Sequence, residues 1–168
     1  YPIHSFSVLI AGGDIRRVPL LPLDGLLERL EEATQASWPR PKMLIASFPH
    51  NPTTATVDLP FLTRMVDFCR RHDLIFVHDL AYAEICYDGY RPPSALQVPG
   101  ALDCTIEFTS LSKSHAMAGW RVGFGAGNAE YVRMLSRVKS YLDYGTFQPI
   151  QIATIVALVL HFGPSQLR

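Results

Sequence analysis

Two short apolar runs separated by a single amphipathic helix constrain the fold of this chain more than any other feature. The runs, residues 42–48 and 74–77, have the length and composition of buried strands. Asp58 stands where the N-cap of the intervening helix belongs. Strand, helix and strand in this order predict a βαβ unit with parallel strands and a right-handed crossover. Asn51 and Asp79, which follow the two strands, should therefore share one edge of the sheet. The expected buried stripe of the helix comprises Leu62, Met65, Val66 and Cys69.

The next two strands require a change of direction. Residues 104–109 are rich in β-branched and aromatic side chains, and residues 121–126 also have a strand pattern. Only about a dozen residues separate them, whereas a parallel crossover needs a dozen or more, usually in a helix. We therefore expect the second strand to run antiparallel, with Asn128 capping the helix that follows. The predicted fold class is α/β, with a mostly parallel sheet, one antiparallel strand and helices on both faces.

The remaining segments predict helices and connections around this sheet. Residues 3–11 are apolar without a clean period, so their pattern allows a helix or a strand. Residues 14–20 predict a short strand, and a helix over residues 24–35 should be capped by the aspartate that begins it. Residues 81–102 form a long connection with three prolines, a kind that usually has a function or a short helix of its own. The last helix, from about residue 148 to 161, is apolar nearly all round, so we expect other parts of the molecule or a partner to cover it.

Composition indicates one globular domain that acts on small molecules. The chain has 168 residues, of which 48% are hydrophobic, and its 15 basic and 15 acidic side chains cancel, which leaves no electrostatic footprint for nucleic acid. Three scattered cysteines, Cys69, Cys86 and Cys104, favour reduced thiols in the cytoplasm, and no cysteine or histidine cluster has metal-ligand spacing. The apolar run at residues 152–160 is too short to span a membrane. Since the chain does not begin with methionine, we expect it to be a piece of a longer protein.

Chemistry is concentrated in the stretch from residue 110 to 121, which starts where the third strand should end. A lysine there, Lys113, can react covalently with a carbonyl group. The hydroxyl groups of Ser110 and Ser112 and the guanidinium of Arg121 can hold a phosphate. Lysine chemistry beside a phosphate site suggests pyridoxal phosphate (PLP) as the cofactor. A solvated surface loop is the alternative for this stretch, and Arg121 could instead guard an edge strand against aggregation.

Asp79, Asn51 and Tyr82 can complete such a site. A pyridine cofactor needs an anion at its ring nitrogen, and Asp79 ends an apolar strand at the same sheet edge. Asn51 and Tyr82 could supply neutral donors for the phenolic oxygen of the ring. Two structural alternatives remain open, because Asp79 could cap the following turn and the Asn-Pro pair could be only a turn.

Three ordered motifs resemble the signatures of the class I and II aminotransferases of PLP fold type I. They are Phe-Pro-His-Asn-Pro-Thr at residues 48–53, His-Asp-Leu-Ala-Tyr at 78–82, and Ser-Leu-Ser-Lys at 110–113 followed by Gly-Trp-Arg-Val-Gly at 119–123. The resemblance covers the whole chain, and the sequence beyond the motifs is similar to that of alanine-type and LL-diaminopimelate transaminases. It implies the fold of a PLP-transferase large domain.

The resemblance also implies a role for each site residue. Lys113 would form the Schiff base with PLP, Asp79 would pair with the pyridine nitrogen, and Asn51 and Tyr82 would bind the ring oxygen. The phosphate would be held by Ser110, Ser112 and Arg121. Tyr1 falls where the family has an aromatic side chain stacked on the cofactor, and His4 falls where some members have a partner for the aspartate.

Departures from the family pattern limit what this chain should do alone. Thr54 stands where the family usually has glycine, which predicts strain in that turn. Family members are much longer, so the resemblance makes residues 1–168 a partial PLP-binding large domain without the N-terminal segment and the small domain. It also implies a cytoplasmic homodimer, with this fragment inactive on its own.

The activity implied is transfer of an amino group between a small amino acid and a 2-oxo acid, of the alanine and glutamate type. The alternatives are another PLP reaction, such as a β-lyase or a decarboxylase, and a non-catalytic ligand-binding module.

Overall fold

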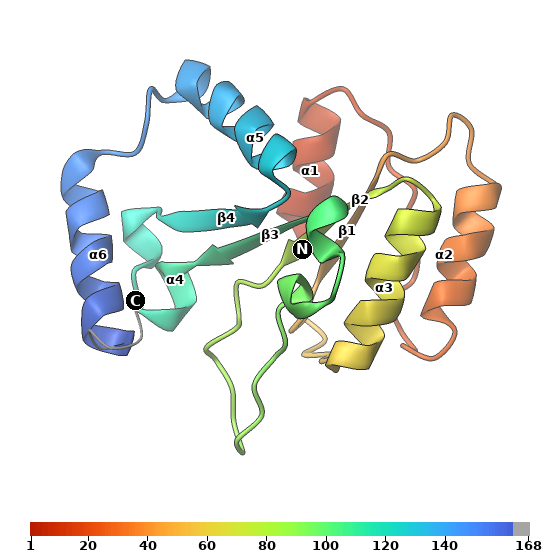
Figure 1. Ribbon diagram of the computed structural model, residues 1–168, viewed down its shortest axis with the longest axis horizontal. Coiled ribbons are helices and arrows are strands. Elements are labelled where there is room, and N and C mark those ends of the chain that lie inside the picture. Colours follow the sequence, from red (N-terminus) through yellow and green to blue (C-terminus); the bar gives the residue numbers. More distant parts are fainter. Residues whose placement is uncertain (163–168) are drawn as a thin grey trace.

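A four-stranded sheet in chain order forms the centre of the structure, a computed structural model that describes residues 1–162 (Figure 1). The strands are β1 (Met43–Ser47), β2 (Ile75–Asp79), β3 (Thr105–Ser110) and β4 (Gly123–Gly127). β1, β2 and β3 are parallel, and β4 pairs with β3 in the antiparallel direction. The predicted mixed sheet and its reversed fourth strand are therefore confirmed.

The register of the sheet brings the ends of three strands to one edge. Ser47, the last residue of β1, pairs with Asp79, the last residue of β2. Asp79 also pairs with Phe108 of β3, two residues before that strand ends at Ser110. The segments that leave β1, β2 and β3 thus begin beside one another, at the edge where open α/β sheets bind ligands.

The helix α3 (Leu59–Arg71) covers one face of the sheet because its apolar stripe matches the buried side chains of β2. The N-cap is Asp58, as predicted, since its Oδ1 accepts a hydrogen bond from the Phe61 amide at 2.8 Å. Phe76 of β2 lies in the same core, which also receives α2 (Leu26–Gln35). The buried side chains of α3 are Phe61, Leu62, Met65, Val66, Phe68 and Cys69.

The opposite face carries α1 (Pro2–Ile10) and α5 (Ala129–Leu142), so the sheet has helices on both faces. His4 of α1 reaches Asp79, whose side chain lies opposite to those of its neighbours Phe76 and His78 in the strand alternation. α5 packs against β4, and Asn128 caps it as predicted, because Asn128 Oδ1 accepts from the amides of Glu130 and Tyr131. The undecided segment at residues 3–11 is therefore mostly helix.

The chain leaves β3 directly into a short helix, α4 (Leu111–Ser114), and then a 3-10 turn, η3 (Ala118–Trp120). The predicted strand at residues 121–126 was wrong at its start. Arg121 ends the η3 turn with a left-handed backbone, φ 53°, and β4 begins two residues later. Arg121 is thus a loop residue, and the proposed role as an edge-strand guard does not apply to it.

Two other predictions near the amino end were wrong. Residues 14–20 form no strand, since no strand in the described part of the chain pairs with them. Asp24 is not the N-cap of α2, because Gly25 takes that position with φ 78° and no side chain caps the helix. The long connection after β2 does contain short helices of its own, η1 (Ala95–Gln97) and η2 (Ala101–Asp103).

The last helix, α6 (Gln148–Phe162), lies at the side of the molecule beyond β4 (Figure 1). Several of its apolar side chains are exposed. Its exposed apolar side chains are Ile152, Ile155, Val156 and Leu160. Nothing within the described residues buries this stripe, as its sequence anticipated. None of the described helices combines the length and the hydropathy that a bilayer crossing requires.

Candidate functional site

The carboxylate of Asp79 stands at the centre of the edge where β1, β2 and β3 end. Its Oδ2 is 2.8 Å from Nε2 of His4, and its Oδ1 accepts a hydrogen bond from the amide of Ala81 at 3.1 Å. Burial raises the pKa of Asp79, but the hydrogen bonds from His4 and Ala81 outweigh burial, so the pKa lies below its ordinary value. Asp79 is therefore an anion at neutral pH, and it caps its turn and binds His4 at the same time.

The amide of Asn51, in the loop after β1, joins the phenol of Tyr82, in the segment after β2. Asn51 Nδ2 donates to Tyr82 Oη at 3.0 Å, across 31 positions of sequence. The Nζ atom of Lys113 lies 5.8 Å from the centroid of the Tyr82 ring, within the range of a cation–π contact. The structure thus brings together three predicted site residues from three different strand ends.

Ser110 shapes the turn from β3 into α4. Its Oγ accepts from the amide of Ser112 at 3.1 Å and donates to the carbonyl of Val122 at 3.3 Å. The first bond caps the helix that presents Lys113, and the second ties that helix to the chain entering β4. Ser110 and Ser112 are half-buried, whereas Lys113 is exposed.

Arg121 and Tyr1 lie at the margin of this cluster. One Arg121 nitrogen, Nη1, donates to the carbonyl of Ala118 at 2.9 Å, and the side chain is exposed. Tyr1 contacts His4 edge to face, with ring centroids 5.3 Å apart, and is 54% exposed. The structure therefore places Tyr1 next to the partner of Asp79, while no described contact joins Arg121 to Ser110 or Ser112.

Sequence reasoning missed two features close to this edge. His50, just before Asn51, holds Thr53 through Nδ1 at 2.8 Å. Burial lowers the pKa of His50, and the charges of the amino terminus and of His4 lower it further, so these groups lie near one another. The second feature is a buried contact on the far face of the sheet, where His78 Nδ1 is 2.8 Å from Glu107 Oε2. The signal available in the sequence was a glutamate in the middle of an apolar strand.

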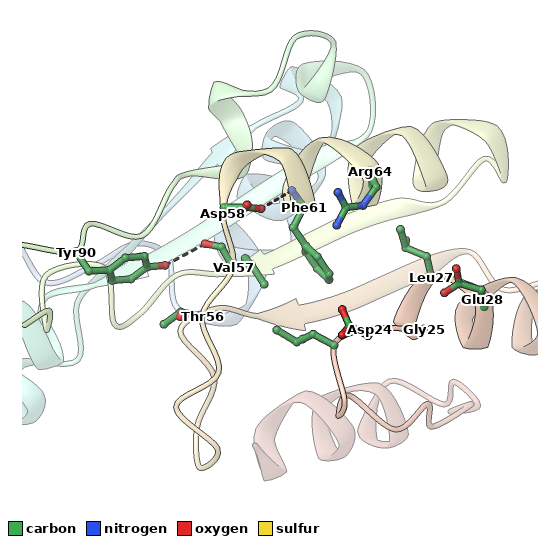
Figure 2. A pocket seen from close by; sticks show the side chains of 11 residues that line it. Asp24, Gly25, Leu27, Glu28, Thr56, Val57, Asp58, Phe61, Arg64 and Tyr90 are labelled. Atoms are coloured by element: carbon green, nitrogen blue, oxygen red, sulfur yellow. Dashed lines mark hydrogen bonds between the residues drawn. The ribbon is translucent and has the colours of Figure 1, made fainter.

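A separate hollow of about 590 Å³ lies between the starts of α2 and α3 (Figure 2). The described residues that line it include none of the predicted site residues. Tyr90 borders this hollow, and its hydroxyl donates to the carbonyl of Val57 at 3.0 Å. Among the described residues, no group of three histidine, cysteine or acidic side chains could hold a metal ion.

Comparison with known proteins relates this chain to one family. A model described as "Aminotransferase class I and II" matches residues 1–164. A glutamate-pyruvate aminotransferase, AlaC, of Escherichia coli K12 is 52% identical over 158 residues, which is 94% of this chain and 38% of that protein. An LL-diaminopimelate aminotransferase of Nitratidesulfovibrio vulgaris is 48% identical over 94% of this chain and 41% of its own length. The chain thus spans about two-fifths of the length of these relatives.

Solved structures agree with this grouping. A probable N-succinyldiaminopimelate aminotransferase from Thermus thermophilus superposes with a TM-score of 0.85 at 33% identity, over 94% of this chain and 42% of that one. An aspartate aminotransferase variant from Thermus thermophilus gives a TM-score of 0.83 at 29% identity, over 94% and 41%. The family match covers nearly the full chain. The mixed sheet and the motif residues at its edge are consistent with that match. The chain belongs to the class I and II aminotransferase family.

Proposed function

We propose that this chain is the cofactor-binding part of a PLP-dependent aminotransferase that moves an amino group between a small amino acid and a 2-oxo acid, of the alanine and glutamate type. Family membership implies PLP as the cofactor. The choice of substrates is supported by the 52% identity to a protein named glutamate-pyruvate aminotransferase. In the proposed cofactor site, Lys113 is the catalytic residue. The cofactor-binding residues are Tyr1, Asn51, Asp79, Tyr82, Ser110, Ser112 and Arg121.

The observation that carries this proposal is the contact of Lys113 Nζ with the ring of Tyr82, which is itself bonded to Asn51. An amine, a neutral amide and a phenol thus lie together at the sheet edge. The carboxylate of Asp79, kept anionic by its two hydrogen-bond donors, adds the charge that a protonated pyridine requires. This donor set therefore fits PLP.

PLP, when bound, supplies an aldehyde that condenses with amines and a ring that accepts electrons from the substrate. In the proposed roles, Lys113 would hold the cofactor through Nζ and, when free, would carry a proton at Nζ to and from the substrate carbon. Asp79 holds the ring nitrogen in its protonated state, and His4 fixes the orientation of that carboxylate. Asn51 and Tyr82 donate hydrogen bonds to the ring oxygen, and the ring of Tyr1 stacks on the cofactor.

The phosphate is assigned to Ser110, Ser112 and Arg121. The two serines lie at the end of β3, where the first turn of α4 begins. A guanidinium has five N–H donors, and the bond of Arg121 to Ala118 uses one of them. Arg121 can thus bind an anion with its other donors without leaving its loop.

At the scale of the whole protein, we propose that residues 1–168 are the central part of the large domain, that the active form is a homodimer, and that it works in the cytoplasm on small molecules. The exposed apolar stripe of α6 supports association, because contiguous apolar surface is rarely left in water. The share of the relatives that is matched, about two-fifths, supports a partial domain.

An amino-donor screen tests the activity. The full-length protein that contains this chain is loaded with PLP and supplied with 2-oxoglutarate and either alanine or LL-diaminopimelate, with Lys113→Ala as the matched control. The proposal expects glutamate from the alanine reaction and none from the variant. Turnover of LL-diaminopimelate alone would reassign the substrate to that of the second relative. Ammonia released without any 2-oxo acid would overturn amino transfer and indicate a lyase.

A further inference from the structure

Glu107 is the centre of a buried hydrogen-bond network on the sheet face opposite Asp79. Its carboxylate accepts from Ser94 Oγ at 2.7 Å, from the Ala95 amide at 2.8 Å and from His78 Nδ1 at 2.8 Å. Glu107 is 9% exposed and His78 is fully buried. A carboxylate removed from water must be satisfied by such donors, and three of them occupy most of its lone pairs.

The network joins the three chain segments that carry the proposed site. His78 immediately precedes Asp79 in β2. Glu107 lies three positions before Ser110 in β3, the strand that leads to Lys113. Ser94 and Ala95 lie in the connection between β2 and β3, which also carries Tyr82. A single carboxylate thus fixes the relative positions of β2, β3 and this connection from behind the sheet.

The ring of His78 has little freedom to adapt. It stacks on Phe76, with centroids 5.7 Å apart and an interplanar angle of 22°, and lies 6.4 Å from the ring of Phe48. In the part of the chain that the structure describes, its Nε2 is buried without a hydrogen-bond partner. Nδ1 is therefore the ring nitrogen that carries the proton of this bond, and it donates to Glu107.

The connection that Glu107 anchors is also tied to the loop after β1. Asn51 bonds Tyr82 near the start of the connection. Val57 accepts from Tyr90 in its middle, the bond drawn in Figure 2. These two bonds link the connection to the segment between β1 and α3.

We propose that Glu107 is a positioning residue for the PLP site. This inference rests on the proposed function. Glu107 points away from the cofactor edge, so it acts through His78, Ser94 and Ala95. Replacing Glu107 by glutamine keeps the volume but removes the negative charge, which weakens the bonds from Ala95 and His78, and it turns an amide N–H₂ toward Ser94 Oγ, which must then accept in place of donating. At metal sites, loss of a group that orients a ligand typically costs about 10- to 100-fold in affinity, and we expect an effect at the lower end of that range here.

The test compares Glu107→Gln, His78→Phe and Ser94→Ala with Val66→Ala, which loosens the α3 core without touching the network. In each variant, a titration gives the Kd for PLP, the visible spectrum gives the absorption maximum of the bound cofactor, and thermal melting gives Tm. The proposal expects Glu107→Gln and His78→Phe to raise Kd about tenfold and to move the absorption maximum, with a smaller change for Ser94→Ala. Val66→Ala should lower Tm and leave both cofactor readouts unchanged.

Two results would overturn the inference in different ways. If Glu107→Gln and Ser94→Ala lower Tm as Val66→Ala does, with unchanged Kd and absorption maximum, the network only stabilises the fold. If the wild-type protein itself forms no reducible adduct at Lys113, the proposed function fails first, and the inference fails with it.

Discussion

The sequence leaves two alternative roles open for Asp79, a turn cap and a cofactor contact, and one carboxylate can perform both. A carboxylate has two oxygens, and here one caps the turn through Ala81 while the other binds His4. The capping bond fixes the orientation of the group, and the histidine favours its charged form. At this position the turn motif and the proposed cofactor contact support each other.

The acidity of Asp79 makes its contribution to stability depend on pH. Since the folded pKa lies below the unfolded value of about 3.9, the contribution is complete above that value and is lost as pH falls through the folded pKa. We expect Asp79→Asn to lower the free energy of unfolding by about 1–2 kcal/mol at pH 7. The difference from wild type should shrink below about pH 4. Urea melts at several pH values measure it, with exposed Asp67→Asn as control. A pH-independent difference would contradict this account.

Thr54 carries the strain that its place in the Asn-Pro-Thr turn predicts. Its φ is 57°, a left-handed conformation that costs a residue with a Cβ about 1–2 kcal/mol. After the entropy that glycine loses on folding, Thr54→Gly should raise the free energy of unfolding by about 0.5–1 kcal/mol. Thr53→Gly is the matched control, because Thr53 bonds His50 and has no positive φ, so it should destabilise the protein. Chemical denaturation that finds both variants destabilised would rule out strain at Thr54.

At the scale of elements, the sequence predicted what short-range physics controls. The direction of β4 followed from a connection too short for a parallel crossover, and the caps Asp58 and Asn128 followed from side chains that bond the first helical amides. The errors arose where a longer-range partner decides the outcome. In the described part of the chain, no strand pairs with residues 14–20. Gly25, with a left-handed backbone, takes the N-cap position of α2 in place of Asp24.

The candidate site divides in the same way. Strand ends and motif spacing placed Asn51, Asp79 and Lys113 at one sheet edge, because parallel strands carry their carboxyl ends to one side. The bond between Asn51 and Tyr82 could not be derived from spacing, since it joins two irregular loops. The network of Glu107 was also hidden, because its partner Ser94 comes from a connection without a periodic pattern.

Asn128 links two elements, and its removal should be costly. Its Oδ1 caps α5, and its Nδ2 donates to the carbonyls of Leu102 and Asp103 at 2.8 and 3.2 Å. Asn128→Ala should lower the free energy of unfolding by about 1–2 kcal/mol. Asn128→Ser keeps a capping oxygen and loses the donor to Leu102 and Asp103, so its effect should be smaller. If denaturation shows equal losses for the two variants, the cap contributes nothing.

The whole molecule leaves apolar side chains exposed on several of its helices. Besides the stripe on α6, apolar side chains of α1 and α5 are exposed. These exposed side chains lie on the outside of the fold, whereas the side chains between α3 and the sheet form a buried core. Such exposed apolar surface supports the association proposed above.

Association should therefore depend on the α6 stripe. Ile155 lies in the middle of this stripe and is 59% exposed. Ile155→Lys would place a charge in an apolar interface formed by the stripe. We expect this variant to shift the protein from dimer to monomer in sedimentation velocity, while Gln35→Lys, which adds the same charge at an exposed position on α2, leaves the dimer intact. An unchanged dimer in Ile155→Lys would exclude this stripe from the interface.

The identity of the lysine that binds PLP tests the central claim most directly. The protein is incubated with PLP, reduced with borohydride, digested and analysed by peptide mass spectrometry. The chain has only three lysines, so Lys42 and Lys139, both exposed, act as internal controls beside the variant Lys113→Ala. The account predicts one pyridoxyl group on Lys113, which the variant lacks. Labelling spread equally over Lys42, Lys139 and the amino terminus, or no labelling at Lys113, would contradict it.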